Sequence, residues 1–304
     1  MTDTLPQQVI DKHSFINNNS SVKELHKGFS SDNKYIIDDT YLLRTFSSQT
    51  ATERMEEFEY ITIAATHSDY VPRAIAFDTI EELGLSYMIL TFLPGEDGEV
   101  ALKYLSDREQ YKAGYRAGEE LRKIHHIPAP KEYSGWYETK KKKSDKYISQ
   151  LEKINLEEDM KLLLKDYIKQ HEHLMVDRPN TIQHDDFHPS NLLIKDNQFA
   201  GIIDFQRMDW GDPVHDLHKL GFFSKPVSIP FTNGIIDGYH GGRDRVTMEF
   251  WRLYALYSAM HVVSAYVWGQ NQLPEQNDLL REYSIAVLDD HDNFKQVIPK
   301  WYPN

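Results

Sequence analysis

The sequence predicts an α+β protein built in two parts, with a β-rich first third followed by a mostly helical remainder. Short runs that alternate apolar and polar residues continue as far as Pro94 and Gly95, which end that pattern. From Ser106 onward, apolar residues recur mainly at helical spacing. Between residues 181 and 205, short apolar runs are interrupted by Asp, His, Asn and Pro, which indicates one compact β and loop insert. We therefore expect two domains, residues 1–95 and 96–304.

Strand and helix patterns follow one another in the first part. Residues 22–46 are typical of a β-hairpin, because apolar runs bracket residues that favour turns. Residues 52–66 predict a helix, since acidic side chains gather in its first turns, where the helix dipole favours them. Two further strands are expected on either side of the turn at residues 81–84.

The second part begins with a clear helix signal. Ser106 followed three residues later by Glu109 is a capping box, and it predicts a helix that ends near His126. A second helix is expected over residues 145–173, and the four lysines at 140–143 are interpreted as a solvated surface turn. Near the C-terminus, Trp251, Tyr254 and Tyr257 form an aromatic stripe. Such a stripe is more often core than the wall of a binding site.

Composition excludes several classes of protein. The chain of 304 residues has no cysteine, so neither disulfides nor thiolate metal sites are possible. No apolar run approaches the roughly 18–20 residues of a membrane span, and the polar N-terminus is unlike a secretory signal, so we expect a cytoplasmic protein without a membrane partner. The net charge of −13 argues against nucleic acid as a partner. Oligomeric state is left open.

One block carries the residues best suited to chemistry. Asp186 and Asn191 are five residues apart, and Asp204 follows an apolar run thirteen residues later. Phosphoryl transfer requires a carboxylate that orients a hydroxyl and accepts its proton, together with oxygen ligands for Mg²⁺. One amide and one carboxylate suffice as protein ligands, because Mg²⁺ keeps waters and phosphate oxygens. The spacing therefore favours a phosphoryl-transfer site.

This block resembles the signature of the aminoglycoside phosphotransferase and choline kinase superfamily, a branch of the protein-kinase-like fold. The family pattern is His-Gly-Asp, four residues, Asn, and later Ile-Asp-Phe or Ile-Asp-Trp. Here it is His184-Asp185-Asp186, Asn191 and Ile203-Asp204-Phe205, with Asp185 replacing the usual glycine. The segment from Gly211 to Asp216 matches the family's next motif, and both of its aspartates are interpreted as structural, holding the loop or capping a helix.

The resemblance implies a two-lobed protein-kinase-like fold, with a small β-sheet N-terminal lobe that binds nucleotide and a larger helical catalytic lobe. It implies ATP or GTP and Mg²⁺ as cofactors, Asp186 as the catalytic base, and Asn191 and Asp204 as metal ligands. It suggests further binding residues for the nucleotide and the acceptor: Arg44 for phosphates with Glu57 (or Glu53 or Glu56) as its acidic partner, Ser30 and Ser31 in the hairpin over the triphosphate, Thr91, Phe92 and Leu93 for the base, and Asp209 and Trp210 for the acceptor.

The identity of the acceptor is left open by the sequence. An aminoglycoside-like antibiotic is favoured, and choline or another amino alcohol, a sugar derivative and a macrolide are alternatives. Residues 176–304 carry seventeen acidic and eleven basic side chains, which favours a neutral or cationic acceptor.

Two other functions must be weighed. A metallohydrolase could use His184, His188, His215 and His218, although Pro189 disfavours the helix that such a site needs, and His184 is more typical of a structural residue. A catalytically silent kinase-like binding protein is disfavoured, because Asp186, Asn191 and Asp204 are all present.

Overall fold

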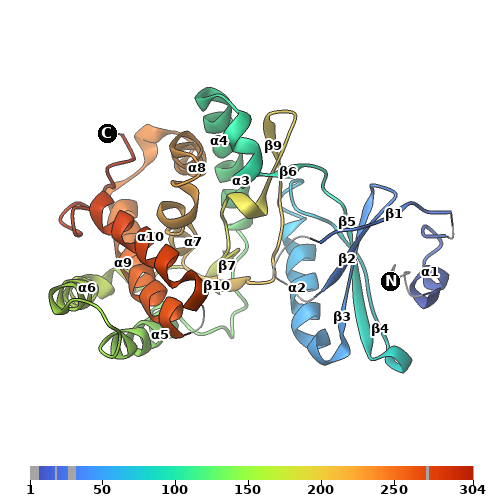
Figure 1. The fold of residues 1–304 in the computed structure, drawn as a ribbon, viewed down its shortest axis with the longest axis horizontal. Helices are drawn as coiled ribbons and strands as arrows, with labels where there is room; N and C mark the ends of the chain where they lie inside the picture. Colours follow the sequence, from blue (N-terminus) through green and yellow to red (C-terminus); the bar gives the residue numbers. More distant parts are fainter. Residues whose placement is uncertain (1–6, 18, 27–31, 272–273, 304) are drawn as a thin grey trace. The chain divides into compact units, whose positions relative to one another are not determined.

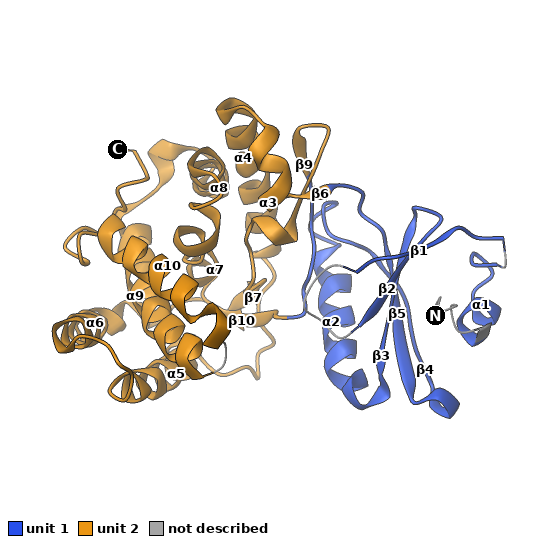
Figure 2. Ribbon diagram, viewed as in Figure 1, with its two compact units in different colours: residues 1–95, 200–206 blue, residues 96–199, 207–304 orange. Residues whose placement is uncertain are grey.

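A computed structural model describes residues 7–17, 19–26, 32–271 and 274–303. The chain divides into two compact units (Figure 2). The first contains residues 1–95 and 200–206, and the second contains residues 96–199 and 207–304. The sequence-based division did not place residues 200–206 in the first unit. They belong there because the chain returns to it, with the Ile202 N–H donating to the Tyr70 carbonyl at 2.8 Å.

The first unit is built on a five-stranded antiparallel sheet with the strand order β1-β2-β3-β5-β4 (Figure 1). The expected strands and the expected helix are present, and the turn before β5 uses Gly84 at φ 59°. The elements are α1 (Gln7–Lys12), β1 (Val22–Glu24), β2 (Asn33–Ile37), β3 (Tyr41–Ser47), α2 (Ala51–Ala64), β4 (Ala74–Ile80) and β5 (Leu85–Thr91).

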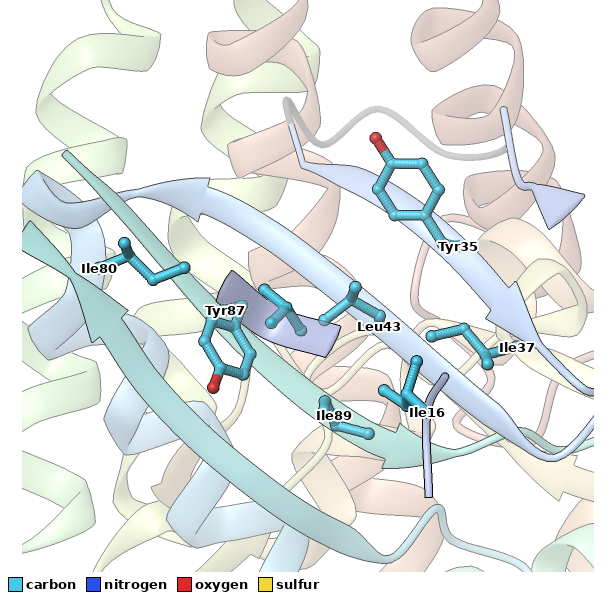
Figure 3. Packing of buried hydrophobic residues seen from close by; sticks show 8 residues of the cluster. Ile16, Tyr35, Ile37, Leu43, Ile80, Tyr87 and Ile89 are labelled. Carbon is cyan, nitrogen blue, oxygen red and sulfur yellow. The ribbon is translucent and has the colours of Figure 1, made fainter. Parts of the chain in front are cut away.

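Alternation along the strands gives the sheet two different faces. One face forms an apolar cluster with Val9 of α1 (Figure 3). The cluster consists of Val9, Ile16, Tyr35, Ile37, Leu43, Ile80, Tyr87 and Ile89. Residues next to these along β2 and β3 must point to the other face, and there Lys34 pairs with Arg44 across the two strands. This second face carries the charged groups of the unit.

The second unit contains most of the helices and two small sheets, with the strand orders β10-β7 and β6-β8-β9. None of the helices in the described ranges is long and apolar enough to cross a membrane. The helices are α3 (Gly98–Ala101), α4 (Asp107–Ile124), α5 (Trp136–Leu151), α6 (Glu158–His171), α7 (Pro213–Leu217), α8 (Ile229–His240), α9 (Met248–Asn271) and α10 (Asn277–Asp290). The strands are β6 (Glu96–Asp97), β7 (Thr181–Gln183), β8 (Leu192–Lys195), β9 (Gln198–Ile202) and β10 (Asp209–Gly211).

The capping box is confirmed, and α4 ends one turn before Pro128. The helix expected over residues 145–173 is instead two helices, α5 and α6, because the chain turns at residues 152–157, where Ile154 is buried. The lysine run is also not a surface turn. It lies within α5, since lysine is a good helix former and Trp136, Ser144 and Ile148 bury one side of this helix.

The aromatic stripe of α9 is core, as its spacing suggested. Trp251, Tyr254 and Tyr257 are each at most 2% exposed. The Tyr257 hydroxyl is satisfied by donating to Asp212 at 2.7 Å and accepting from the Trp136 ring nitrogen at 2.8 Å. These rings therefore support the second unit from inside.

Helices α4 and α8 pack with their backbones in direct contact (Figure 1). Each contributes two glycines four residues apart, Gly114 and Gly118 from α4, and Gly234 and Gly238 from α8. A Cβ atom added to Gly118 would lie 2.1 Å from the Ile235 carbonyl oxygen, far inside van der Waals contact. Glycine is required here because no side chain fits between the two helices.

We predict that Gly118→Ala lowers the free energy of unfolding by about 1–3 kcal/mol, through overpacking against α8. In an unconstrained helix the same change would stabilise the protein by about 1 kcal/mol. The sign of the change in unfolding free energy therefore tells the two cases apart. Urea denaturation measures the effect, with Lys112→Ala on the exposed side of α4 as control. A stabilised Gly118→Ala protein would contradict the close approach.

Candidate active site

The loop at residues 184–191 is held in place by Asp216, a residue of α7 that is 0% exposed. Its two carboxylate oxygens accept the backbone N–H groups of His184 at 2.6 Å and Asp185 at 2.7 Å. His125, at the end of α4, lies 3.0 Å from the same carboxylate. A buried carboxylate needs such partners, so the loop backbone and Asp216 fix one another.

Asp185 adopts a left-handed backbone conformation, with φ at 50°. Glycine reaches this region without strain, whereas other residues pay for it, Asp and Asn least. Lys219 offsets this cost by donating to the Asp185 carbonyl oxygen and lying 3.3 Å from its carboxylate. The replacement of glycine by Asp185 is therefore matched by a buried lysine that lies 34 residues later in the sequence.

Asp186 and Asn191 form a connected pair within the second unit. The Asn191 side-chain N–H group donates to the Asp186 carbonyl at 3.0 Å and to its carboxylate at 3.2 Å. With its nitrogen engaged in this way, the Asn191 side chain offers its carbonyl oxygen, Oδ1, as a ligand atom. His184 is fully buried and accepts the Asp186 N–H on its Nδ1 at 3.2 Å, which makes it a structural residue of the loop.

Positive charges surround the Asp186 carboxylate, which is 23% exposed. His188 Nε2 lies 3.5 Å from it, and the Lys219 and Arg207 side-chain nitrogens each lie 3.9 Å from it. Burial alone would raise the pKa of Asp186, but the hydrogen bond from His188 and the charges of Lys219 and Arg207 hold it well below its ordinary value. Asp186 is therefore ionised at neutral pH.

Asp204 follows β9 and is described within the first unit, where it is exposed and has φ at 65°. Phe205 beside it is 1% exposed and anchors the segment. In that unit, burial and the charge of Arg44 lower the pKa of Lys34, while the charge of Asp204 raises it. Asp204 therefore lies within electrostatic range of Lys34.

The β8–β9 hairpin separates Asn191 and Asp204 along the chain. Asn191 immediately precedes β8 and Asp204 follows β9, and the two strands are neighbours in one sheet. Strands joined by a short turn begin and end at the same end of the hairpin. The hairpin therefore accounts for most of the thirteen-residue spacing between Asn191 and Asp204.

Arg44 and Glu57 form the ion pair that the sequence suggested, with a nitrogen–oxygen distance of 2.5 Å. The sequence did not reveal that Asp32 and Arg54 complete a buried network with them. Asp32 lies 2.7 Å from Arg44 and 2.6 Å from Arg54, and Arg54 lies 3.0 Å from Glu57. All four side chains are at most 8% exposed, so two positive and two negative charges neutralise one another inside the unit.

The other residues predicted to bind the nucleotide are only partly described by the structure. Ser30 and Ser31 lie outside the described residues. The N–H groups of Thr91 and Phe92 donate to the Arg73 and Thr40 carbonyls at 2.9 and 2.7 Å, respectively.

Asp209 and Trp210 also differ from one another. Asp209 is exposed and accepts the Tyr133 hydroxyl at 2.6 Å. Trp210 is 6% exposed on β10, so its ring packs inside the second unit.

Three of the acidic residues that suggested a cationic acceptor have partners inside the second unit. Asp212 is 0% exposed and accepts from Arg178 at 2.8 Å, while Asp216 and Asp185 are held as described above. His215, His218 and His261 lie side by side, with ring centres 4.5 and 4.8 Å apart. Among the described residues, no group of three or more His, Asp or Glu side chains could hold a metal ion.

We predict that Arg44→Met lowers the free energy of unfolding by about 3–5 kcal/mol, because it leaves Asp32 and Glu57 as buried charges with one cation between them. The control is Lys23→Met, which removes an exposed ion pair with Asp39 and should cost at most about 1 kcal/mol. If urea denaturation gave the same loss of unfolding free energy for both variants, the buried network would contribute no more to stability than an exposed ion pair.

Comparisons with known proteins agree with the fold. A model of the phosphotransferase enzyme family matches residues 21–251, more than half of the chain. A comparison with curated protein sequences found no match.

Several solved structures of aminoglycoside phosphotransferases resemble this chain. The ternary complex of APH(2'')-IIa with streptomycin and ATP has a TM-score of 0.65 and 17% identity, covering 95% of this chain and 97% of that one. The GDP complex of aminoglycoside 2'-phosphotransferase-IIIa has a TM-score of 0.66 and 18% identity, covering 92% and 97%. A thermostable APH(4)-Ia variant with AMP-PNP and hygromycin B has a TM-score of 0.65 and 14% identity, covering 93% and 97%.

At these identities the solved structures show a shared protein-kinase-like fold, and the fold predicted from the sequence is confirmed. The family match is independent of them and covers the 184–191 loop together with Asp204. The chain therefore belongs to the phosphotransferase enzyme family.

Proposed function

We propose that this protein is a small-molecule kinase that transfers the γ-phosphoryl group of ATP or GTP to a hydroxyl group. The observation that carries the proposal is the ionised Asp186, linked to Asn191 on a loop whose backbone Asp216 fixes. Such a loop presents a carboxylate in a defined position, which is what orienting an acceptor hydroxyl requires.

Asp186 is the proposed catalytic base. Its carboxylate accepts a hydrogen bond from the acceptor hydroxyl and aims the oxygen at the γ-phosphorus. As the oxygen–phosphorus bond forms and the bond to the leaving diphosphate breaks, the hydroxyl proton passes to Asp186. Because its pKa is low, Asp186 contributes mainly by orientation, and it takes the proton when the attacking oxygen has become acidic.

Asn191 Oδ1 and the Asp204 carboxylate are the proposed Mg²⁺ ligands. Hard oxygen donors in this small number fit Mg²⁺, which when bound neutralises charge on the nucleotide phosphates. Hydrogen bonds to Asp186 orient the Asn191 side chain, and the buried Phe205 anchors the backbone next to Asp204.

The first unit is proposed to bind the nucleotide. Backbone groups of residues 91–93 would bind the base, with the Thr91 and Phe92 carbonyls and Leu93 as the candidates, because two N–H groups there already donate elsewhere. Arg44 is held by Asp32 and Glu57, so it sets the position of β3 against α2. Lys34 pairs with Arg44 across β2 and β3, and the charge of Asp204 raises its pKa. Lys34 is therefore a second candidate, besides Arg44, for binding the nucleotide phosphates.

The acceptor is proposed to be a small hydroxylated molecule bound by the second unit. Aminoglycosides are the first class to test, since solved relatives carry streptomycin and hygromycin B, followed by amino alcohols, sugar derivatives and macrolides. A nucleotide-consumption screen in Mg²⁺ should identify at least one hydroxylated compound that is phosphorylated in a 1:1 ratio with nucleotide used. Failure to bind ATP or GTP would overturn the proposed function.

Asp186→Asn is expected to lower kcat by roughly 10²–10⁴ while leaving nucleotide affinity and the fold nearly unchanged, because the amide cannot accept the proton. Steady-state kinetics and nucleotide titration measure the two effects. Asp196→Asn, in the exposed β8–β9 turn, is the matched control and should behave like the native protein. Near-native turnover in folded Asp186→Asn protein would rule out this base.

Asp204→Ala is expected to weaken Mg²⁺-dependent nucleotide binding at least tenfold, because the triphosphate loses a protein-anchored counter-charge. Titration of ATP with and without Mg²⁺ tests this, with Asp196→Ala as control. If the native protein and Asp204→Ala respond to Mg²⁺ equally, Asp204 is not a ligand. One equivalent of zinc in the purified protein would instead support the metallohydrolase.

A further inference from the structure

Lys219 is a buried lysine that contacts the 184–191 loop at three points. It follows α7, two residues after that helix ends. Its side-chain nitrogen donates to the Asp185 carbonyl oxygen and lies 3.3 Å from the Asp185 carboxylate. The same nitrogen lies 3.9 Å from the Asp186 carboxylate. One ammonium group therefore joins the side chains of two neighbouring loop residues.

The backbone of Asp185 is held on both sides by the segment that carries Lys219. The Asp185 N–H group donates to Asp216 at 2.7 Å, and its carbonyl oxygen accepts from Lys219. The backbone of Lys219 is fixed as well, because its carbonyl accepts the N–H groups of Phe222 at 3.1 Å and Phe223 at 2.9 Å. Together these bonds fix the direction in which the chain continues into the next loop residue.

The Asp185 and Asp186 carboxylates lie close together, because both contact one nitrogen atom. Neighbouring carboxylates repel one another, and without a cation between them one would turn away. Lysine suits this position, since its ammonium group is a compact charge with three hydrogen-bond donors. Lys219 therefore allows both carboxylates to remain on the same side of the loop.

Of the three basic side chains beside Asp186, Lys219 is the most enclosed. Its side chain is 9% exposed, whereas those of His188 and Arg207 are 20% and 56% exposed. Solvent screens the charge of an exposed group more than that of a buried one. Lys219 therefore exerts the least screened of these charges on Asp186.

The proposed reaction changes the charge beside Lys219. When the acceptor proton passes to Asp186, that carboxylate becomes neutral. Asp185 stays 3.3 Å from Lys219, so the buried cation is not left without a partner. In the absence of Asp185, Lys219 would pair with Asp186 alone and oppose the proton transfer. Asp185 and Lys219 therefore depend on one another.

We propose that Lys219 is a positioning residue for phosphoryl transfer and that Asp185 is its required partner. Lys219 holds the loop so that the Asp186 carboxylate meets the acceptor oxygen, and Asp185 balances the charge of Lys219. This inference rests on the proposed kinase function. It adds to the site a residue that lies 33 positions after Asp186 in the sequence.

Release of inorganic phosphate from Mg-ATP, with water as the acceptor, measures transfer without a named alcohol. Lys219→Met removes the charge and should lower kcat at least about tenfold, while the KM for Mg-ATP changes by less than about twofold. The control is Lys225→Met, which breaks an ion pair with Asp290 elsewhere in the second unit and should keep the native kcat. Native kcat in folded Lys219→Met protein would overturn the proposal.

Lys219→Gln separates charge from hydrogen bonding, because an amide still donates to the Asp185 carbonyl but carries no charge. This variant should lose as much kcat as Lys219→Met, and urea denaturation checks that each variant is folded. If Lys219→Gln turned over at the native rate, the charge would have no part in positioning Asp186, and the proposal would fail.

A double-mutant cycle with Asp185→Gly tests the partnership. Glycine adopts a φ near 50° without strain, so this change removes the carboxylate and keeps the backbone path. Asp185→Gly alone should lower kcat at least about tenfold, because Lys219 then pairs with Asp186 alone. Combined with Lys219→Met, the loss should be less than about threefold, because residues in contact are not additive. Losses that multiply would overturn the partnership.

Failure of the proposed function gives a different result. A native protein that uses no Mg-ATP, with water or with any acceptor, overturns the kinase and this inference together. Native turnover that Lys219→Met leaves unchanged overturns this inference alone.

Discussion

The position of the 184–191 loop depends on one buried carboxylate that lies outside the loop. Asp216 accepts two consecutive backbone N–H groups and pairs with His125, so both of its carboxylate oxygens are engaged. His125 ends α4, and α4 is itself placed by glycines that let it touch α8. The geometry of Asp186 is therefore set by helix packing that begins well outside the loop. A small error there would be transmitted to the reacting groups.

In the first unit, buried ion pairs rather than close backbone packing fix the elements relative to one another. Two arginines and two carboxylates neutralise one another where β2, β3 and α2 meet. Such a buried network costs desolvation and gains specificity only if each member is satisfied. The result is a sheet with one apolar face and one charged face, and Lys34 extends the charged face toward Asp204.

Local signals were sufficient for most of the fold. The capping box and the strands of the first unit depend on residues close in sequence, and both were predicted in place. The errors have a common origin in tertiary contacts. The helix expected over residues 145–173 is interrupted at residues 152–157, where Ile154 is buried against the rest of the unit, and Asp32 meets Arg44 only in the folded unit. Likewise, nothing local indicates that Lys219, 34 residues after Asp185, supports that residue's backbone.

The number of charged residues in a segment does not show which charges a ligand can meet. The second unit's aspartates suggest an acidic site when they are summed, yet Asp212, Asp216 and Asp185 are consumed by internal partners. The lysines of α5 also differ from one another, because Lys141 pairs with Asp145 and Glu172 whereas Lys143 and Lys146 are exposed. A ligand responds only to charge that protein groups have not already neutralised. The charge that a ligand meets is therefore a property of the folded unit, and a sum over the chain does not give it.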